Sequence, residues 1–170
     1  PFIIVPTKDS IGLRPDSTDS RLVELRDMMP TLLSMAGIPV PASVEGMSLL
    51  DPGARREHVY GELWEDDRAT RMIRTETHKL IYYAVGNVFQ LFDLEKDPLE
   101  LRDLSRDPAS SGILAALTEK LIGNLYGNDL AWVKDGKLAG LPDKSFRFRP
   151  DQENVGVLRN RDLLIQRGIR

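Results

Sequence analysis

The sequence has no cysteine among its 170 residues. This absence excludes disulfides, thiolate metal ligands and a cysteine-derived catalytic group from these residues. The chain also has no apolar run near the roughly 18 residues that a membrane helix requires, and no series typical of a signal peptide. We therefore expect no membrane partner. The compartment, cytoplasmic or periplasmic, stays open because a signal peptide would precede Pro1.

A large excess of one sign of charge is also absent. The 23 basic and 26 acidic residues are interspersed and give a net charge of -3, so the chain has no bulk attraction to nucleic acid. Arginine alternates with phenylalanine over residues 146–149, a pattern found in some nucleic-acid-binding segments. Asp143, Asp151 and Glu153 dilute that charge, and we expect no nucleic-acid partner.

What is present is a globular composition, 41% hydrophobic and 29% charged. The run Phe-Ile-Ile-Val at residues 2–5 is closed by Pro6 and predicts a strand buried on both faces, as in parallel sheets. No second run of this kind alternates with helices, so a complete α/β sheet cannot be built from this chain. We interpret residues 1–50 as the trailing piece of an α/β domain, with an edge strand of a self-contained domain as the alternative.

The segment from Asp27 to Ala36 has a helical pattern. Asp27 can cap the helix, Pro30 is tolerated in a first turn, and Gly37 ends it. The apolar side chains of this helix are expected to pack into a core: Met28, Met29, Leu32, Leu33, Met35 and Ala36.

Four runs of strand length follow: residues 58–64, 70–76, 79–85 and 88–94. Gly86-Asn87 separates the last two and favours a two-residue hairpin turn, so we expect an antiparallel meander. A helix over residues 109–126 is predicted next, with apolar residues at helical spacing: Ile113, Leu114, Leu117, Leu121, Leu125 and Tyr126.

The predicted fold class is therefore α+β: a four-stranded antiparallel sheet packed against a carboxy-terminal helix, preceded by the last strand and helix of an α/β domain. The expected division is residues 1–50 for that trailing piece, 51–134 for the small α+β subdomain and 135–170 for an extended tail.

Residues 90–108 contain an acidic phrase twice, Asp93-Leu-Glu-Lys-Asp97-Pro and Asp103-Leu-Ser-Arg-Asp107-Pro. An EF-hand is rejected because the loop lacks its central Gly and has Leu and Pro at ligand positions. A repeat is rejected because the residues before the two copies differ. Capping remains: each copy ends in an Asp before a Pro, and Glu100 is placed for a capping box. Such a cap contributes about 1 kcal/mol.

Two blocks of the sequence carry a resemblance. The first comprises Asp27-x-x-Pro30-Thr31, Ala36-Gly37-Ile38-Pro39 and Glu45-Gly46-x-Ser48-Leu49; the second comprises Arg74, Lys79 and the phrase from Leu91 to Glu100. In this order and separation they resemble the carboxy-terminal third of arylsulfatase-type sulfatases of the alkaline-phosphatase-like superfamily.

That resemblance implies a parent hydrolase of sulfate esters with a formylglycine, made from the Cys or Ser of a Cys/Ser-x-Pro-x-Arg motif, and a divalent ion, usually Ca²⁺. This sequence has no such motif. We expect no catalytic residue, metal ligand or cofactor in this chain, and no activity from it alone. Its expected role is to support the active-site rim and assembly. Its expected partners are the rest of the catalytic domain and a sulfated small molecule or sugar.

Two alternatives stay open. The parent could be a phosphonate or phosphate ester hydrolase, since such relatives share the architecture. The chain could instead be a stand-alone binding or oligomerisation module with this fold.

One segment has candidate substrate-rim residues. It is residues 61–68, Gly-Glu-Leu-Trp-Glu-Asp-Asp-Arg, in which Leu63 stands where related sulfatases have a His. The candidates are Glu62, Trp64, Asp66 and Asp67; a solvated hairpin loop with one packed Trp is the alternative. Two adjacent carboxylates supply too few ligands for calcium. His58 and His78 match no metal or acid–base spacing, and we expect them on the surface.

We predict that the tail contributes to a homo-oligomer, with Leu163, Leu164 and Ile165 as its anchor. Deleting residues from Phe146 onward should shift the oligomer distribution in light scattering. An unchanged mass would refute this role of the tail.

Overall fold

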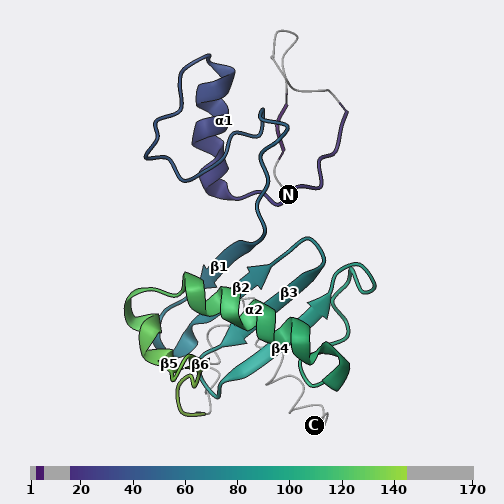
Figure 1. The fold of residues 1–170 in the computed structure, drawn as a ribbon, viewed down its shortest axis with the longest axis vertical. Helices are drawn as coiled ribbons and strands as arrows, with labels where there is room; N and C mark the ends of the chain where they lie inside the picture. The colour runs from purple at the N-terminus through teal and green to yellow at the C-terminus, as the bar shows by residue number, and fades with distance from the viewer. Residues whose placement is uncertain (1–2, 6–15, 145–170) are drawn as a thin grey trace, which may run out of the picture.

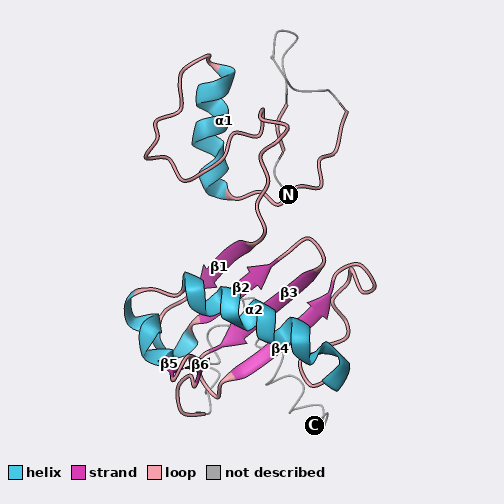
Figure 2. Ribbon diagram, in the orientation of Figure 1, coloured by secondary structure: helices cyan, strands magenta, loops and turns pink. Residues whose placement is uncertain are grey.

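The computed structural model describes residues 3–5 and 16–144. Within these ranges the chain forms an N-terminal part around helix α1 (Met28–Met35) and a sheet with helix α2 (Ser111–Asn124) across one face (Figures 1 and 2). The segment between residues 50 and 59 connects the two. No helix in the described ranges is long and apolar enough to span a membrane. The tail from residue 145, with its predicted role in assembly, lies outside the described residues.

The sheet confirms the predicted α+β meander. Its strands are β1 (Val59–Leu63), β2 (Thr70–Arg74), β3 (His78–Tyr83) and β4 (Val88–Asp93), paired antiparallel in the order β1-β2-β3-β4. The predicted two-residue turn is wrong in length: the four residues 84–87 join β3 to β4, Asn87 N donates to Ala84 O at 3.1 Å, and Gly86 and Asn87 have positive φ, 76° and 49°. The Tyr82 hydroxyl donates to Asn87 Oδ1 at 3.0 Å and fixes this turn.

The core lies between α2 and one face of the sheet. Side chains alternate along the strands, so Leu80 and Tyr82 face α2 while Ile81 lies on the other face. The buried core residues are Ile73, Leu80, Tyr82 and Leu91 of the sheet and Leu117, Leu121 and Leu125 at α2. Contacts of this kind contribute roughly 25 cal/mol per Å² of apolar surface buried.

Helix α2 is shorter than predicted. Leu125 has an extended conformation, with ψ 144°, and ends the helix after Asn124. Tyr126, predicted on its apolar face, is therefore beyond the helix and exposed, and Ile113 is exposed as well. Leu117, Leu121 and Leu125 alone supply the fully buried ridge.

A short hairpin closes the end of the core. The 3-10 helix η4 (Gly127–Trp132) leads into β5 (Val133–Lys134), which pairs with β6 (Lys137–Leu138). The Trp132 ring is 6.2 Å from the Tyr82 ring. Gly140 follows with φ 64°, and a Cβ there would lie 2.4 Å from Ala84 O. Glycine therefore allows the hairpin to reach the end of β3.

All four aspartates of the acidic doublet accept backbone N–H groups. Asp93 accepts from Glu95 and Lys96, Asp97 from Arg102, Asp103 from Leu91 and Ser105, and Asp107 from Ala109. Only Asp107 begins a helical segment, the 3-10 turn Pro108–Ser110 that leads into α2. The predicted capping box at Glu100 is wrong, because its carboxylate pairs with Lys79 instead.

The strand predicted at residues 2–5 is not formed in the part that is described. Residues 3–5 have no strand assignment, and Ile3 and Val5 are exposed. A strand needs a neighbour to pair its backbone groups, and no described residue pairs with residues 3–5.

Helix α1 does not bury its apolar side chains as predicted, although Leu33 and Met35 are half-buried. Pro30 and Thr31 are its buried residues, whereas Met28, Met29 and Leu32 are exposed. The reason is the loop over residues 45–50, which packs against α1 through backbone hydrogen bonds. Thr31 Oγ1 donates to Asp27 O at 2.6 Å and accepts from Leu49 N at 3.0 Å.

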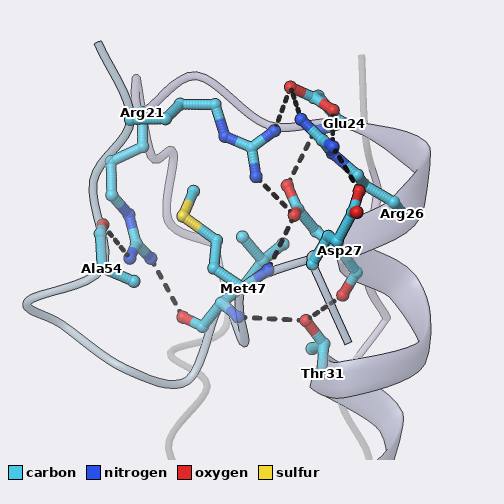
Figure 3. Close-up of polar contacts among 10 residues, drawn as sticks. Arg21, Glu24, Arg26, Asp27, Thr31, Met47 and Ala54 are labelled. Carbon is cyan, nitrogen blue, oxygen red and sulfur yellow. Dashed lines mark hydrogen bonds and ion pairs between the residues drawn. The ribbon is translucent and has the colours of Figure 1, made fainter. Parts of the chain in front are cut away.

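Asp27 is at the centre of this packing and is fully buried (Figure 3). Its side chain does not cap α1 as predicted. Asp27 Oδ2 accepts from Glu24 N at 2.7 Å, and Oδ1 accepts from Met47 N at 3.0 Å and from the Arg56 guanidinium at 2.5 Å. One carboxylate thus joins α1 to two loops, and the ion pair and N–H donors offset the cost of burying its charge.

The Asp27 packing leaves no room for a side chain at Gly46, where a Cβ would lie 2.0 Å from Arg26 O. We predict that Gly46→Ala lowers the free energy of unfolding of the N-terminal part by about 3 kcal/mol, because two backbone segments must separate. Proton exchange of the Met47 amide, followed by NMR, measures this directly.

The matched control is Gly123→Ala on α2, where nothing lies within 4 Å of the added Cβ. Alanine should stabilise that helix by about 0.5–1 kcal/mol. Unaltered protection of Met47 in Gly46→Ala would contradict the predicted collision.

Candidate functional site

The candidate rim residues lie where β1 passes into β2. Strand β1 ends at Leu63, and the connection contains the 3-10 turn Asp66–Arg68 before β2 begins at Thr70. Trp64 and Asp66 both have positive φ, 58° and 53°, which costs free energy in residues other than glycine. Neighbouring contacts must therefore hold this connection in place.

Arg71 provides those contacts. Its Nε and one terminal nitrogen donate to the two carboxylate oxygens of Asp129 at 2.6 and 3.0 Å, in a bidentate pair. The other terminal nitrogen donates to Trp64 O at 2.9 Å and Thr70 O at 3.0 Å. The guanidinium also lies 5.2 Å from the centre of the Trp132 ring, within cation–π range. Arg71 thus joins the connection to η4.

The Arg71–Asp129 pair is buried on both sides. Burial disfavours the positive charge, but the hydrogen bonds that Arg71 donates to Asp129, together with the attraction between the two charges, outweigh burial and raise the pKa of Arg71 above its ordinary value. The bidentate geometry of the pair is that of a positioning element.

Glu62 extends this cluster toward the surface. It is opposite Arg71 in the register of β1 and β2, and its Oε2 lies 3.7 Å from Arg71 Nε. The Tyr126 hydroxyl donates to Glu62 Oε1 at 2.6 Å. This bond to a carboxylate raises the pKa of Tyr126. Burial raises the pKa of Tyr60, whose hydroxyl has no hydrogen-bond partner.

The structure unites two of the four predicted residues. Glu62 and the main chain of Trp64 contact Arg71, while the Trp64 side chain is exposed. Asp66 is exposed, and Asp67 pairs with Lys144. The tryptophan that packs is Trp132, not Trp64.

Sequence reasoning missed Arg71, Tyr126 and Asp129. One signal was available for Arg71: it occupies the same face of its strand as Ile73, two positions later, so alternation places it inside. No pattern in the sequence indicates that Tyr126 and Asp129 belong to the site, because the residue at which α2 ends determines where both side chains lie.

The described residues offer no metal-binding cluster. No group of three or more His, Asp or Glu side chains among them is placed to hold an ion. His58 and His78 are half-buried, not on the open surface as predicted: His58 Nε2 lies 3.0 Å from Asn124 Nδ2, and His78 Nδ1 lies 2.8 Å from Thr77 Oγ1. The sequence has no Cys/Ser-x-Pro-x-Arg motif for a formylglycine, the described residues do not fit a calcium site, and no chemical step is assigned to them.

Residues 4–125 match the family of N-sulphoglucosamine sulphohydrolase carboxy-terminal domains. The chain is 32% identical over 143 residues to an arylsulfatase of Clostridium perfringens, covering 81% of this chain and 30% of that protein. It is 39% identical over 101 residues to a Δ4,5-hexuronate-2-O-sulfatase of Bacteroides thetaiotaomicron, covering 52% of this chain and 21% of that protein. The chain thus spans less than a third of the length of either relative.

Solved structures agree on the fold. A 2-O GAG sulfatase superposes with a TM-score of 0.54 at 33% identity, covering 64% of this chain and 26% of that one. A phosphonate monoester hydrolase of Agrobacterium radiobacter gives a TM-score of 0.50 at 24% identity, covering 61% and 25%. The second likeness concerns the fold alone.

We predict that Arg71→Ala lowers the free energy of unfolding by roughly 3–5 kcal/mol, because it leaves the Asp129 carboxylate buried without a partner. Urea unfolding followed by circular dichroism measures the loss. The matched control is Lys120→Ala, which breaks the exposed pair with Glu57 and should change stability by about 1 kcal/mol or less. Equal effects of the two substitutions would refute the anchoring role of Arg71.

Proposed function

Because this chain belongs to the family of N-sulphoglucosamine sulphohydrolase carboxy-terminal domains, within the sulfatases of the alkaline-phosphatase-like superfamily, we propose that it is part of a hydrolase of sulfate esters. The observation that carries this proposal is the family match over residues 4–125. The contacts among the motif residues support it. The Asp27 and Thr31 motif is hydrogen-bonded to the 45–49 motif, and Lys79 pairs with Glu100.

The contribution of the chain would be structural support of the active-site rim. The rim residues proposed are Glu62, Trp64, Asp66 and Asp67. This proposal is supported by the position of these residues in and beside the connection between β1 and β2, which is exposed but is held in place by the buried Arg71. The nucleophile, the formylglycine and the Ca²⁺ expected of a sulfatase would belong to residues outside this chain.

The partner surface would be the apolar side of α1. Met28, Met29 and Leu32 are exposed on α1, and Leu25 before it and Ile38 after it are exposed as well. Several exposed apolar side chains in one part of a chain are typical of a site that another layer covers. We propose that the rest of the catalytic domain covers it. Residues 1–50 would then be the trailing piece of that domain, residues 51–134 the α+β subdomain and residues 135–170 the tail.

The substrate would be a sulfated sugar or another sulfated small molecule. Support comes from two relatives whose names specify sulfated sugars, the Δ4,5-hexuronate-2-O-sulfatase and the 2-O GAG sulfatase. A phosphonate or phosphate ester hydrolase remains the second candidate, because the fold of the Agrobacterium radiobacter enzyme is shared.

The test is expression of the complete reading frame that encodes this chain. We expect the purified protein to hydrolyse 4-nitrophenyl sulfate faster than a phenylphosphonate ester, and the 170-residue chain alone to hydrolyse neither. Both activities are followed by release of the nitrophenolate or phenolate product.

A preference for the phosphonate ester would establish the second candidate instead. A complete frame that lacks Cys/Ser-x-Pro-x-Arg would refute the hydrolase and favour a stand-alone binding or oligomerisation module. Activity of the pure 170-residue chain would refute the supporting role.

A further inference from the structure

The sheet has a second face, opposite the face that α2 covers. Side chains alternate along each strand, so the register of the four strands determines which residues share this second face. Figure 1 shows α2 across the first face and no described helix or strand across the second. We define the outer face as two neighbouring rows of side chains: Met72, Ile81 and Gln90, and then Leu63, Thr70, Tyr83 and Val88.

The outer face is largely apolar. Met72, Ile81, Tyr83 and Val88 are half-buried, and Leu63 is exposed. The Tyr83 hydroxyl donates to Gln90 Oε1 at 2.9 Å, so these two polar groups are bonded to each other within the face. A sheet with apolar side chains on both faces is typical of a sheet that is covered on both sides.

The last described residues lie at one end of this sheet. Leu141 N donates to Ala84 O at 2.7 Å, and Gly86 N donates to Leu141 O at 3.0 Å, so the chain passes the end of β3. Lys144 then pairs with Asp67 in the connection between β1 and β2. The row that contains Leu63, Thr70, Tyr83 and Val88 is at this same end of the strands. Residues 145–170 therefore start beside the outer face.

The first residues of the tail suit an apolar surface. They read Ser-Phe-Arg-Phe-Arg-Pro over residues 145–150. Alternate side chains of an extended chain point to the same side, about 7 Å apart, so Phe146 and Phe148 can share one side and the two arginines the other. A row across four strands is roughly 14 Å long, which is enough for both rings.

Charge also favours this placement. Residues 65–68 of the connection have three carboxylates and one arginine, whereas residues 144–149 have three basic side chains and no acidic one. The pair between Lys144 and Asp67 joins these two segments within the described residues. Opposite charges on two neighbouring segments fix their register and disfavour other arrangements.

We propose that Phe146 and Phe148 cover the outer face of the sheet in their own chain. Their rings pack on Tyr83, Val88 and Ile81, and the arginines between and after them face the acidic connection. The connection between β1 and β2 is then held from both sides: by Arg71 on the α2 face and by the tail on the outer face. This inference does not depend on the proposed hydrolysis.

The tail of a second copy has the same chemistry and is the competing occupant. The chain's own Phe146 follows the anchored Lys144 by only two residues, so its effective concentration at the outer face is far higher than that of a free partner. The other competitor is the rest of the catalytic domain. Both are distinguished by the test.

Methyl NMR of the 170-residue chain tests the proposal. In the double variant Phe146→Ser with Phe148→Ser, the methyl resonances of Ile81 and Val88 should shift, because two aromatic rings leave their surroundings. Those of Leu117 and Leu121, in the core on the α2 side, should stay unchanged and report an intact fold. Unchanged Ile81 and Val88 resonances would overturn the proposal.

The matched control is Leu163→Ser with Leu164→Ser, which removes two apolar side chains from a later part of the same tail. It should leave the Ile81 and Val88 resonances in place. If this control shifts them as much as the phenylalanine variant does, the assignment to Phe146 and Phe148 is wrong.

Two further measurements identify the occupant. Tenfold dilution of the unsubstituted chain should not move the Ile81 and Val88 resonances; movement on dilution would show that a second copy supplies the rings and would overturn the proposal. In the complete protein the phenylalanine variant should cause the same shifts. No response there would show that the rest of the catalytic domain covers the face, which also overturns it. None of these readouts requires ester hydrolysis, so failure of the proposed function would leave them interpretable.

Discussion

The bidentate bond between Arg71 and Asp129 determines the arrangement of the sheet edge that carries the candidate rim. Strand β1 and the connection after it have few buried side chains of their own. Their position comes from the guanidinium, which uses its remaining nitrogen on the carbonyls of Trp64 and Thr70. A lysine at this position could not bond to both Asp129 oxygens and to the β1–β2 connection at once, because all three of its N–H donors are on a single nitrogen atom. The planar guanidinium of arginine is needed to join β2, the β1–β2 connection and η4 at one point.

Asp27 has the complementary role in the N-terminal part. There a buried carboxylate accepts from the backbone of Glu24 and Met47 and pairs with Arg56. In both places a single buried ion organises backbone that has no regular partner. Two residues of the family motif, Asp27 and Gly46, therefore have a structural role in this fold. Asp27 supplies hydrogen-bond acceptors, and Gly46 allows two backbone segments to approach each other.

The sequence predicted the α+β sheet well because each strand is short, β-branched or aromatic, and separated from the next by a clear turn such as Gly86-Asn87. It predicted α1 but not its orientation, because Met28 and Leu32 follow an amphipathic pattern that the packing around Asp27 overrides. At the site, Glu62 and Trp64 could be singled out through the resemblance to sulfatases, which have a similar segment after the first strand of the sheet. Arg71, Asp129 and Tyr126 could not be grouped with them, since their proximity depends on the register of β1 with β2 and on where α2 stops.

The order of the strands also governs how the sheet is assembled in time. Every pairing in it joins neighbours along the chain, so each closure encloses a short loop and loses little chain entropy. The connection between β2 and β3, residues 75–77, is the shortest of the three, and the four residues 84–87 join β3 to β4. Helix α2, Trp132 and Asp129 follow the four strands in the sequence. The Arg71–Asp129 contact that holds the rim therefore spans 58 residues, far more than any strand pairing in the sheet.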